Sequence, residues 1–422
     1  MSKELKELKW NELKLRIGKH GEEITSALCE LYEVFGTEIV DWYASLYDPE
    51  HGMWYHAKSA QATDGYLPDI ESMWDAVGFL TELGATEGTP WYKLFPDWLK
   101  AKIGKFVYNL QDPDGYFYHP QWGKNIHNLR KSRDLGTCIR CLRYLGIEPK
   151  YRLPTATDST EGKRDLSAAP TQFQSVEGFK KYLADMDFVT NSYKCGSELS
   201  SSMGEVEAYG KMLGEDLVKI TLDTLAAHQR KDNGLWHPEA NRYGGNGAQK
   251  ISKIFNWYNR KLPYTDEGID SLMNIIISDE PPNAVVQVYN PWHALASLIR
   301  NKEMSGAPEA ELDALVDRLY EWAPAAIRKS TEHIKLFKQQ DGALSYAPDY
   351  SCATKCGSPC AVPETREGDV NGTACASAMI ASIYNALGLS DYAVPVYSSL
   401  DMKRFLKIVE EREQKYNAEG AK

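Results

Sequence analysis

Apolar residues recur along the chain at the three- and four-residue spacing of amphipathic helices, and no region keeps the period-two alternation of a half-buried strand. Continuous helical stretches are expected at 205–229 and 308–340, and a charged amphipathic helix is expected at 400–416. The pattern predicts an all-α protein without a parallel sheet.

A motif repeats between the predicted helices. Its first copy contains the turn Gly52-Met-Trp-Tyr-His56 and leads to an acidic helix start at Asp69. Its second copy contains the turn Gly115-Tyr-Phe-Tyr-His119 and leads to Asp134. Asp can cap the first amides of a helix, and both apolar runs end in Leu-Gly, which suits a left-handed C-terminal cap. Each unit is therefore expected to be a helical hairpin with an aromatic turn.

Looser copies of the turn occur further along the chain. The turn glycines Gly52, Gly115, Gly234 and Gly342 are 63, 119 and 108 residues apart, close to one, two and two units of roughly 55–60 residues. Six hairpins then fill residues 1–422 as a single domain. They predict an (α/α)6 toroid of about twelve helices in two concentric layers, with inner helices starting near Asp69, Asp134 and Thr373.

Two segments interrupt this periodicity. A Thr-, Ser- and Pro-rich surface loop is expected at about 152–170, and a cysteine-containing loop insertion at about 347–366. Pro291 is expected in the first turn of another inner helix, where its missing amide is tolerated.

Charge and composition narrow the function classes. The net charge of −11 disfavours nucleic acid as a partner, because such binding depends on neutralising phosphates. No apolar run of about 18 residues predicts a membrane span, and residues 1–20 lack the apolar core of a signal peptide. A cytoplasmic protein with free thiols is expected, and its oligomeric state is left open.

The turn Gln111-Asp-Pro-Asp-Gly115 is similar to the Gln-x-x-Asp-Gly turn of terpenoid cyclase repeats. Together with the repeat, it resembles the six-hairpin (α/α) toroid superfamily of terpenoid cyclases, prenyltransferase subunits, polysaccharide lyases and many glycoside hydrolases. The resemblance implies the fold rather than one chemistry. Where protonating cyclases carry Asp-x-Asp-Asp, this chain has Asn371 after Asp369-Val, and an amide cannot donate the proton in the same way.

The turn histidines are candidates for proton transfer. His119 and His237 are predicted as catalytic residues, and His56 as a substrate contact, because each follows aromatic residues in a repeat turn. The alternative is that they hydrogen-bond neighbouring loops. Tyr118 and Trp122 beside His119 are expected to contact substrate.

The carboxylates that enter predicted inner helices are Asp69, Glu71, Asp134, Glu367 and Asp369. A glycosidase needs one protonated and one ionised carboxyl, and Asp69, Asp134 and Asp369 are predicted as catalytic. Each could instead be a helix N-cap.

A second polar set follows His237. Tyr243 is predicted as a catalytic residue, while Arg242 and Asn246 are types that could neutralise a uronate carboxylate in a lyase. Further substrate contacts are predicted at aromatic and amide residues that could equally be core packing: Trp236, Asn290 and Trp292.

The cysteine insertion is the feature that the other repeats lack. From turn glycine to acidic helix start, the first two repeats use 17 and 19 residues and the last uses 27. We expect a wall or lid over a pocket, with at least one thiol of Cys352, Cys356 and Cys360 facing it. No cofactor is expected. Zinc held by these three thiols, and a redox or catalytic thiol, are the alternatives to ordinary loop cysteines.

Taken together, these features favour a carbohydrate-active enzyme, a glycoside hydrolase or a polysaccharide lyase, acting on short acidic oligosaccharides by general acid–base catalysis. The alternatives are an isoprenoid cyclase or hydratase and a non-catalytic glycan- or protein-binding toroid. A mostly apolar pocket wall would favour an isoprenoid, and a mixed polar wall with Trp would favour a sugar.

Overall fold

The computed structural model describes residues 3–156, 166–167 and 169–420, and these residues are mostly helical. Part of the surface loop expected at about 152–170 lies outside the described residues. Within them the only sheets are two antiparallel hairpins, β1 (Tyr47–Asp48) with β2 (Met53–Trp54) and β3 (Thr354–Lys355) with β4 (Ser358–Pro359). The all-α class predicted from the sequence is confirmed, and none of the helices in these ranges has the length and apolarity needed to cross a membrane.

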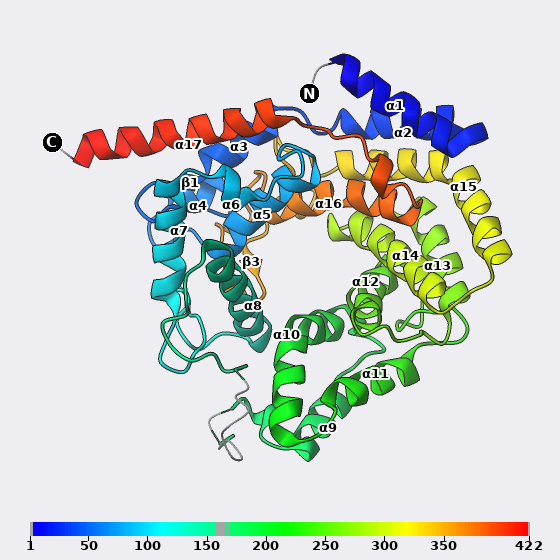
Figure 1. The fold of residues 1–422 in the computed structure, drawn as a ribbon, viewed down its shortest axis with the longest axis horizontal. Helices are drawn as coiled ribbons and strands as arrows, with labels where there is room; N and C mark the ends of the chain where they lie inside the picture. Colours follow the sequence, from blue (N-terminus) through cyan, green and yellow to red (C-terminus); the bar gives the residue numbers. More distant parts are fainter. Residues whose placement is uncertain (1–2, 157–165, 168, 421–422) are drawn as a thin grey trace.

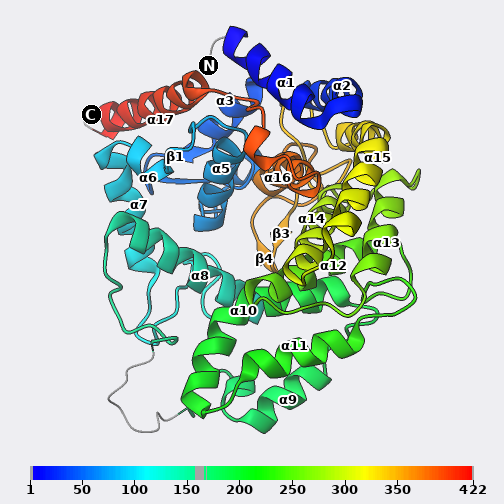
Figure 2. The same ribbon diagram turned by 45° about the vertical axis from the view of Figure 1, so that its right-hand side comes forward.

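Six helices, which we call the lining helices, contact one another in a closed cycle (Figure 1). In cyclic order they are α5 (Ile70–Glu82), α8 (Asn128–Leu145), α10 (Ser192–Leu213), α12 (Arg242–Trp257), α14 (Val286–Met304) and α16 (Val370–Ala386). The other helices pack outside them (Figures 1 and 2). The longer ones are α1 (Lys3–Ile17), α2 (Gly21–Tyr32), α3 (Glu38–Ser45), α7 (Asp97–Leu110), α9 (Val176–Ala184), α11 (Leu217–His228), α13 (Thr265–Ile277), α15 (Glu309–Lys335) and α17 (Ser399–Gly420). Single turns are α4 (Lys58–Ala62), α6 (Trp91–Leu94) and the 3-10 helices Gly18–His20, Thr171–Phe173 and Ser390–Tyr392.

Small residues allow α10, α12 and α14 to approach one another closely. A Cβ added to Gly247 of α12 would lie 2.1 Å from Ser192 Oγ of α10, and one added to Gly196 would lie 2.8 Å from Ile251. Across the next interface, a Cβ on Gly245 would lie 3.1 Å from Pro291 of α14. Larger side chains would push these helices apart, so the glycines set the diameter of this side of the ring.

The repeat turns have a common backbone. Gly52, Gly115, Gly234 and Gly342 all have positive φ, between 66° and 89°, a conformation that glycine adopts without a steric cost. At two of them a preceding glutamine closes the turn: Gln111 Nε2 donates to Gly115 O and Gln229 Nε2 donates to Gly234 O. The sequence therefore placed the turns correctly.

Some of the predicted helix boundaries are correct and others are wrong. Asp69 caps α5 and Asp369 caps α16, since their carboxylates accept from Ser72 N and Gly372 N. The start expected near Asp134 is wrong, because α8 begins at Asn128, where the imidazole of His127 accepts from Leu129 N. The helix expected over 205–229 is also broken, since Gly214 adopts a left-handed conformation, with φ of 70°, and ends α10.

Pro291 lies inside α14 and not in its first turn, which corrects the predicted position. A proline in a helix leaves the carbonyl four residues earlier without its usual donor. Here Arg242 supplies that donor, because its Nη1 donates to Gln287 O at 3.2 Å. Other nitrogens of the same guanidinium donate to Glu280 O, Ser278 O and His333 Nδ1.

Candidate active site

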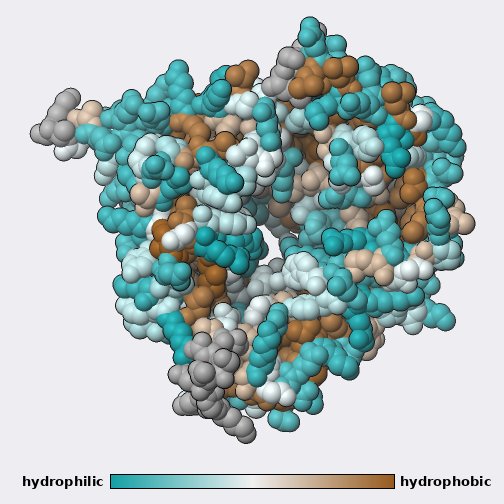
Figure 3. Space-filling view, viewed as in Figure 1, coloured by the Kyte–Doolittle hydropathy of each residue, from teal (hydrophilic) through white to brown (hydrophobic). Residues whose placement is uncertain are grey.

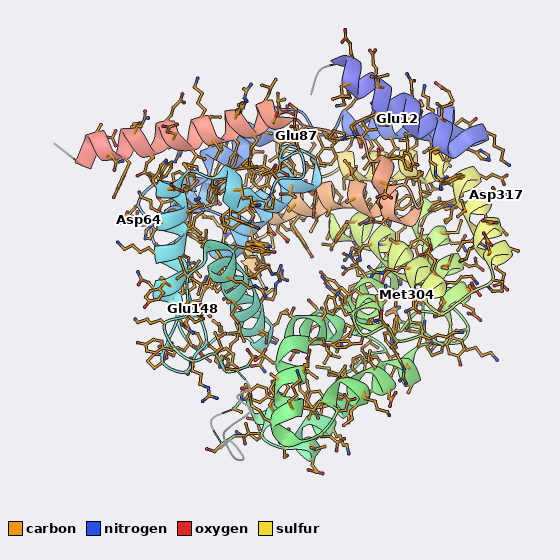
Figure 4. The ribbon with its side chains drawn as sticks, in the orientation of Figure 1. Glu12, Asp64, Glu87, Glu148, Met304 and Asp317 are labelled. Atoms are coloured by element: carbon orange, nitrogen blue, oxygen red, sulfur yellow. The ribbon has the colours of Figure 1, made fainter. Side chains whose placement is uncertain are left out.

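A cavity of about 480 Å³ lies within the cycle of lining helices. All six helices contribute to its wall, and the segment containing β3 and β4 contributes the rest. The space-filling view is hollowed at the same place (Figure 3), and side chains reach toward it from the surrounding helices (Figure 4). The cavity is therefore the candidate active site.

Its wall mixes charged, aromatic and amide groups. The charged residues are Asp75, Glu82, Arg133, Lys194, Lys250 and Lys355. The aromatic residues are Trp74, Phe79, Tyr193, Tyr289 and Tyr346, and the amides are Asn290 and Asn371. Such a wall suits a polar ligand with several hydrogen-bonding groups better than a hydrocarbon chain.

Two carboxyls lie on one helix, α5, at Asp75 and Glu82. The carboxylate of Asp75 pairs with Lys355 Nζ from the hairpin, and its pKa is raised by burial. Glu82 has a weaker partner, the Ser377 hydroxyl at 3.4 Å, and its side chain is open to solvent in the cavity. The protein atoms that surround it, followed by the charge of Asp75, raise its pKa to about 7. A carboxyl with that pKa can hold a proton near neutral pH and still release it.

A buried ion-pair network supports this part of the wall. Glu71 of α5 accepts from Arg130 and Arg133 of α8, and Lys355 Nζ lies 3.4 Å from its Oε1. Burial opposes ionisation of Glu71, but the charges of Arg130, Arg133 and Lys355 hold its pKa well below the usual range. Asp134 completes the network by accepting from Arg130 Nη2 at 2.6 Å. The network joins α5, α8 and the hairpin and fixes the position of Asp75.

Lys250 of α12, like Lys194 of α10, is a cation of the wall without an ion pair to a carboxylate among the described residues. Its ammonium lies 5.4 Å from the centre of the Tyr193 ring. Burial, followed by the charge of Arg133, lowers the pKa of Lys250 to about 8, so the amine is still mainly charged at neutral pH. An unpaired cation in a cavity is a ready site for an anionic group of a ligand.

The cysteine insertion forms part of this wall. Figure 2 shows β3 and β4 inside the ring, and Trp122 Nε1 and Gln121 Nε2 both donate to Pro359 O. Cys352 and Cys356 line the cavity, as expected for at least one of the three thiols. Cys360 is buried behind them. In the described part of the chain no group of three or more His, Cys, Asp or Glu is arranged to hold a metal ion.

The six residues predicted as catalytic lie outside the cavity lining. His119 is buried and hydrogen-bonds Pro68 O through Nε2, with its ring 4.3 Å from that of Trp122. His237 hydrogen-bonds its own segment at Glu239, and Tyr243 is exposed. Asp69 and Asp369 are buried caps, and Asp134 is held by Arg130.

Most predicted substrate contacts have structural partners instead. Trp236 and Trp292 are fully buried, and their indole nitrogens donate to Leu225 O and Ser330 Oγ. Tyr118 donates to Asp114 near the surface, and Asn246 accepts from Asn290. Of the predicted non-cysteine site residues, Asn290 lies in the lining. His56 lies outside the lining, with its Nε2 3.6 Å from Asp369 Oδ1.

Sequence reasoning missed Asp75, Glu82, Lys250 and Lys355. The residues predicted from the sequence lie in the turns and at helix starts, whereas the cavity lies along the helices that follow the turns. Asp75 and Glu82 are six and thirteen residues beyond the cap Asp69, a spacing that places both on one helix face. That spacing was the available signal.

No protein-family model matches the chain, and neither a curated protein nor a solved structure matches it.

Proposed function

We propose that this protein is an enzyme that cleaves a short, anionic oligosaccharide in the central cavity by general acid–base catalysis. The observation that carries the proposal is the composition of the cavity wall, with two carboxyls in different environments, an unpaired lysine and several aromatic rings. The closed cycle of lining helices also supports the finer fold assignment, an (α/α)6 toroid like those of glycoside hydrolases and polysaccharide lyases. Cytoplasmic location remains a prediction from the sequence.

Glu82 is the proposed proton donor to the leaving oxygen. Its pKa of about 7 leaves a large fraction protonated at neutral pH, while the Lys355 ammonium favours the ionised form of Asp75. Glu82 lies seven residues beyond Asp75 on α5, so the two side chains leave the same face of the helix two turns apart.

Lys250 and Arg133 are the proposed contacts for the negative charge of the substrate. Arg133 is already paired with Glu71, whereas Lys250 has no ion pair with a carboxylate among the described residues and can supply charge to the substrate. Tyr193 and Trp74 offer aromatic surface for a sugar ring, although Tyr144 stacks on Trp74 at 6.0 Å. The charged wall argues against the isoprenoid alternative, because a carbocation path needs an apolar, aromatic enclosure.

A panel of neutral and uronate-containing oligosaccharides tests the proposal. New reducing ends without an unsaturated chromophore indicate hydrolysis, and both signals together indicate elimination. We expect turnover of an anionic member, falling as the pH rises above about 7, where Glu82 loses its proton. Absence of turnover across the panel contradicts the proposal.

Protein variants, assayed on an oligosaccharide that the wild-type protein turns over, give a sharper test. Glu82→Gln should lower kcat by about 10²–10⁴-fold, the usual contribution of a general acid. Glu148→Gln is the matched control, because Glu148 lies on the outside of the ring (Figure 4). Lys250→Gln should raise KM for anionic substrates and leave neutral ones unaffected. Equal activity of Glu82→Gln and Glu148→Gln would exclude Glu82 as the acid.

A further inference from the structure

Asparagine side chains join α12 to α14 at two places that differ in their hydrogen bonding. At the first, Asn301 of α14 donates through Nδ2 to Asn256 Oδ1 of α12 at 2.9 Å and to Arg260 O at 2.9 Å. Its Oδ1 accepts from Leu262 N, and Asn256 donates to Ser297 O and Ser297 Oγ. Every nitrogen and oxygen of these two side-chain amides has a partner, so the pair is a structural bridge between the helices.

The second pair lies at the cavity and is incomplete. Asn290 of α14 donates through Nδ2 to Asn246 Oδ1 of α12 at 3.0 Å. Asn290 lies in the cavity lining and is 1% exposed, yet its Oδ1 has no hydrogen-bond partner among the described residues. Because Asn246 takes the amide nitrogen, the oxygen is the atom left for a ligand. A buried amide oxygen without a donor destabilises a protein, and the pair at Asn301 shows that these two helices can satisfy such a group.

A cation of the same wall lies next to this pair. Lys250 is four residues beyond Asn246 on α12, so its side chain leaves the same face of the helix one turn, about 6 Å, further along. Lys250 lines the cavity without an ion pair to a carboxylate among the described residues, and its Nζ lies 5.4 Å from the centre of the Tyr193 ring. Three consecutive lining helices, α10, α12 and α14, thus offer an aromatic ring, a cation and a hydrogen-bond acceptor.

These groups select among ligands by what each group lacks. An amide oxygen accepts a hydrogen bond, so it fits a hydroxyl and not an ionised carboxylate. A neutral sugar leaves the Lys250 ammonium without a counter-charge, and a simple organic acid leaves the Asn290 oxygen without a donor. A sugar acid satisfies both, because it carries a carboxylate and hydroxyls on one ring.

We propose that Lys250 and Asn290 form the specificity site for a uronate unit, with Lys250 binding the carboxylate and Asn290 Oδ1 accepting from a hydroxyl of the same ring. The inference rests on the proposed function and names its sugar class. In the cycle of lining helices, α12 is the third helix from α5 in either direction (Figure 1). The uronate unit is therefore held across the cavity from Asp75 and Glu82 of α5.

Equilibrium binding of small probes tests this assignment without requiring turnover. The probes are methyl glucuronoside, methyl glucoside and cyclohexanecarboxylate, each measured by isothermal titration calorimetry. The glucoside lacks the charge, and cyclohexanecarboxylate has the acid on a six-membered ring without hydroxyls. We expect the wild-type protein to prefer methyl glucuronoside to each of the other two by about tenfold in Kd, the effect of one hydrogen bond to a buried or charged group.

Protein variants separate the two contacts. Lys250→Gln should weaken binding of methyl glucuronoside and cyclohexanecarboxylate by about tenfold and leave methyl glucoside unchanged. Asn290→Leu should weaken only methyl glucuronoside, by about tenfold, so that the preference between the two acids disappears. Asn290→Asp keeps the size of the side chain and should weaken both acids, because its carboxylate gives Lys250 an ion pair. Asn283→Leu is the matched control, since Asn283 is exposed in the segment before α14.

A structural role for Asn290 predicts a different result. Asn290→Leu would then lower the Tm and leave the preference between the two acids unchanged, and that result overturns the proposal. Absence of methyl glucuronoside binding, or wild-type affinity for it in Lys250→Gln, also overturns the uronate site, while turnover of an anionic oligosaccharide keeps the proposed function intact. Binding with the expected variant effects, but without turnover of any oligosaccharide, supports the uronate site and overturns the proposed function.

Discussion

The turns that end in His56 and His119 share a sequence motif and a backbone, yet they place their histidines in different chemical surroundings. Each imidazole is buried near the aspartate that caps the preceding lining helix, His56 near Asp369 of α16 and His119 near Asp69 of α5. At His119 the ring is closed off by Pro68 O and Trp122. At His56 the inserted segment contributes Cys352, whose amide donates to the same aspartate, Asp369, at 3.0 Å.

The difference shows how equivalent turns of a repeat protein can place the same type of residue in different surroundings. The pKa of His119 is lowered, mainly by burial. Burial also acts to lower the pKa of His56, but Cys352 and Asp369 outweigh it and raise that pKa. The turn supplies a fixed imidazole in both repeats. An insertion in a different repeat then decides what that imidazole meets.

The largest expected effect is a difference in stability between alanine variants of the two capping aspartates, Asp369 and Asp69. Asp369→Ala removes the acceptor of three backbone amides, and we expect a loss of at least about 3 kcal/mol in the free energy of unfolding. Asp69→Ala removes an acceptor only for Ser72 and should cost about 1 kcal/mol. Chemical denaturation of both variants gives the comparison, and Asp369→Asn should recover part of the loss. Similar losses at the two positions would show that the inserted segment adds no stability through Asp369.

The pH dependence of stability should have opposite signs at the two histidines. The raised pKa of His56 contributes stability below the unfolded value of about 6.5, and this contribution is lost as the pH rises through the folded pKa. The lowered pKa of His119 costs stability as the pH falls below about 6.5. Replacing His56 by Gln should therefore lower the free energy of unfolding more at pH 5.5 than at pH 7.5. Replacing His119 by Gln should lower it less at pH 5.5 than at pH 7.5. In each variant the difference between the two pH values should be up to about 1 kcal/mol. Denaturation at both pH values measures the sign, and the same sign for both variants contradicts the contrast.

A smaller effect is expected where the second turn contacts the insertion. Trp122→Phe keeps an aromatic ring against His119 but removes the donor to Pro359 O at 2.8 Å, at a cost of about 1 kcal/mol. Amide exchange should quicken in β4 and at Cys360, whose amide donates to Ala353 O. Tyr118→Phe is the control from the same turn, since its hydroxyl contacts Asp114 near the surface, and it should change stability by less than about 0.5 kcal/mol. Unchanged exchange in Trp122→Phe would show that the turn does not support the insertion.

The fold was predictable where local chemistry decides it. Aspartate caps and left-handed glycines act within one turn of chain, so Asp69, Asp369 and the turn glycines were placed correctly. Asp134 failed as a helix start because the imidazole of His127 caps α8, which begins at Asn128, six residues earlier than the expected start. Pro291 failed because Arg242, 49 residues earlier in the chain, satisfies the carbonyl that the proline leaves free.

The candidate site divides in the same way. The sequence by itself determined the helical class, the repeated turns and the segment containing Cys352, because periodicity, glycine conformation and an insertion of extra residues are local properties of the chain. Only the tertiary structure decided that Asp75, Glu82 and Lys250 line one cavity and that Cys352 and His56 both lie against Asp369. The cycle of helices brings together residues that lie hundreds of positions apart, and burial among them sets which carboxyl, amine or thiol keeps its charge.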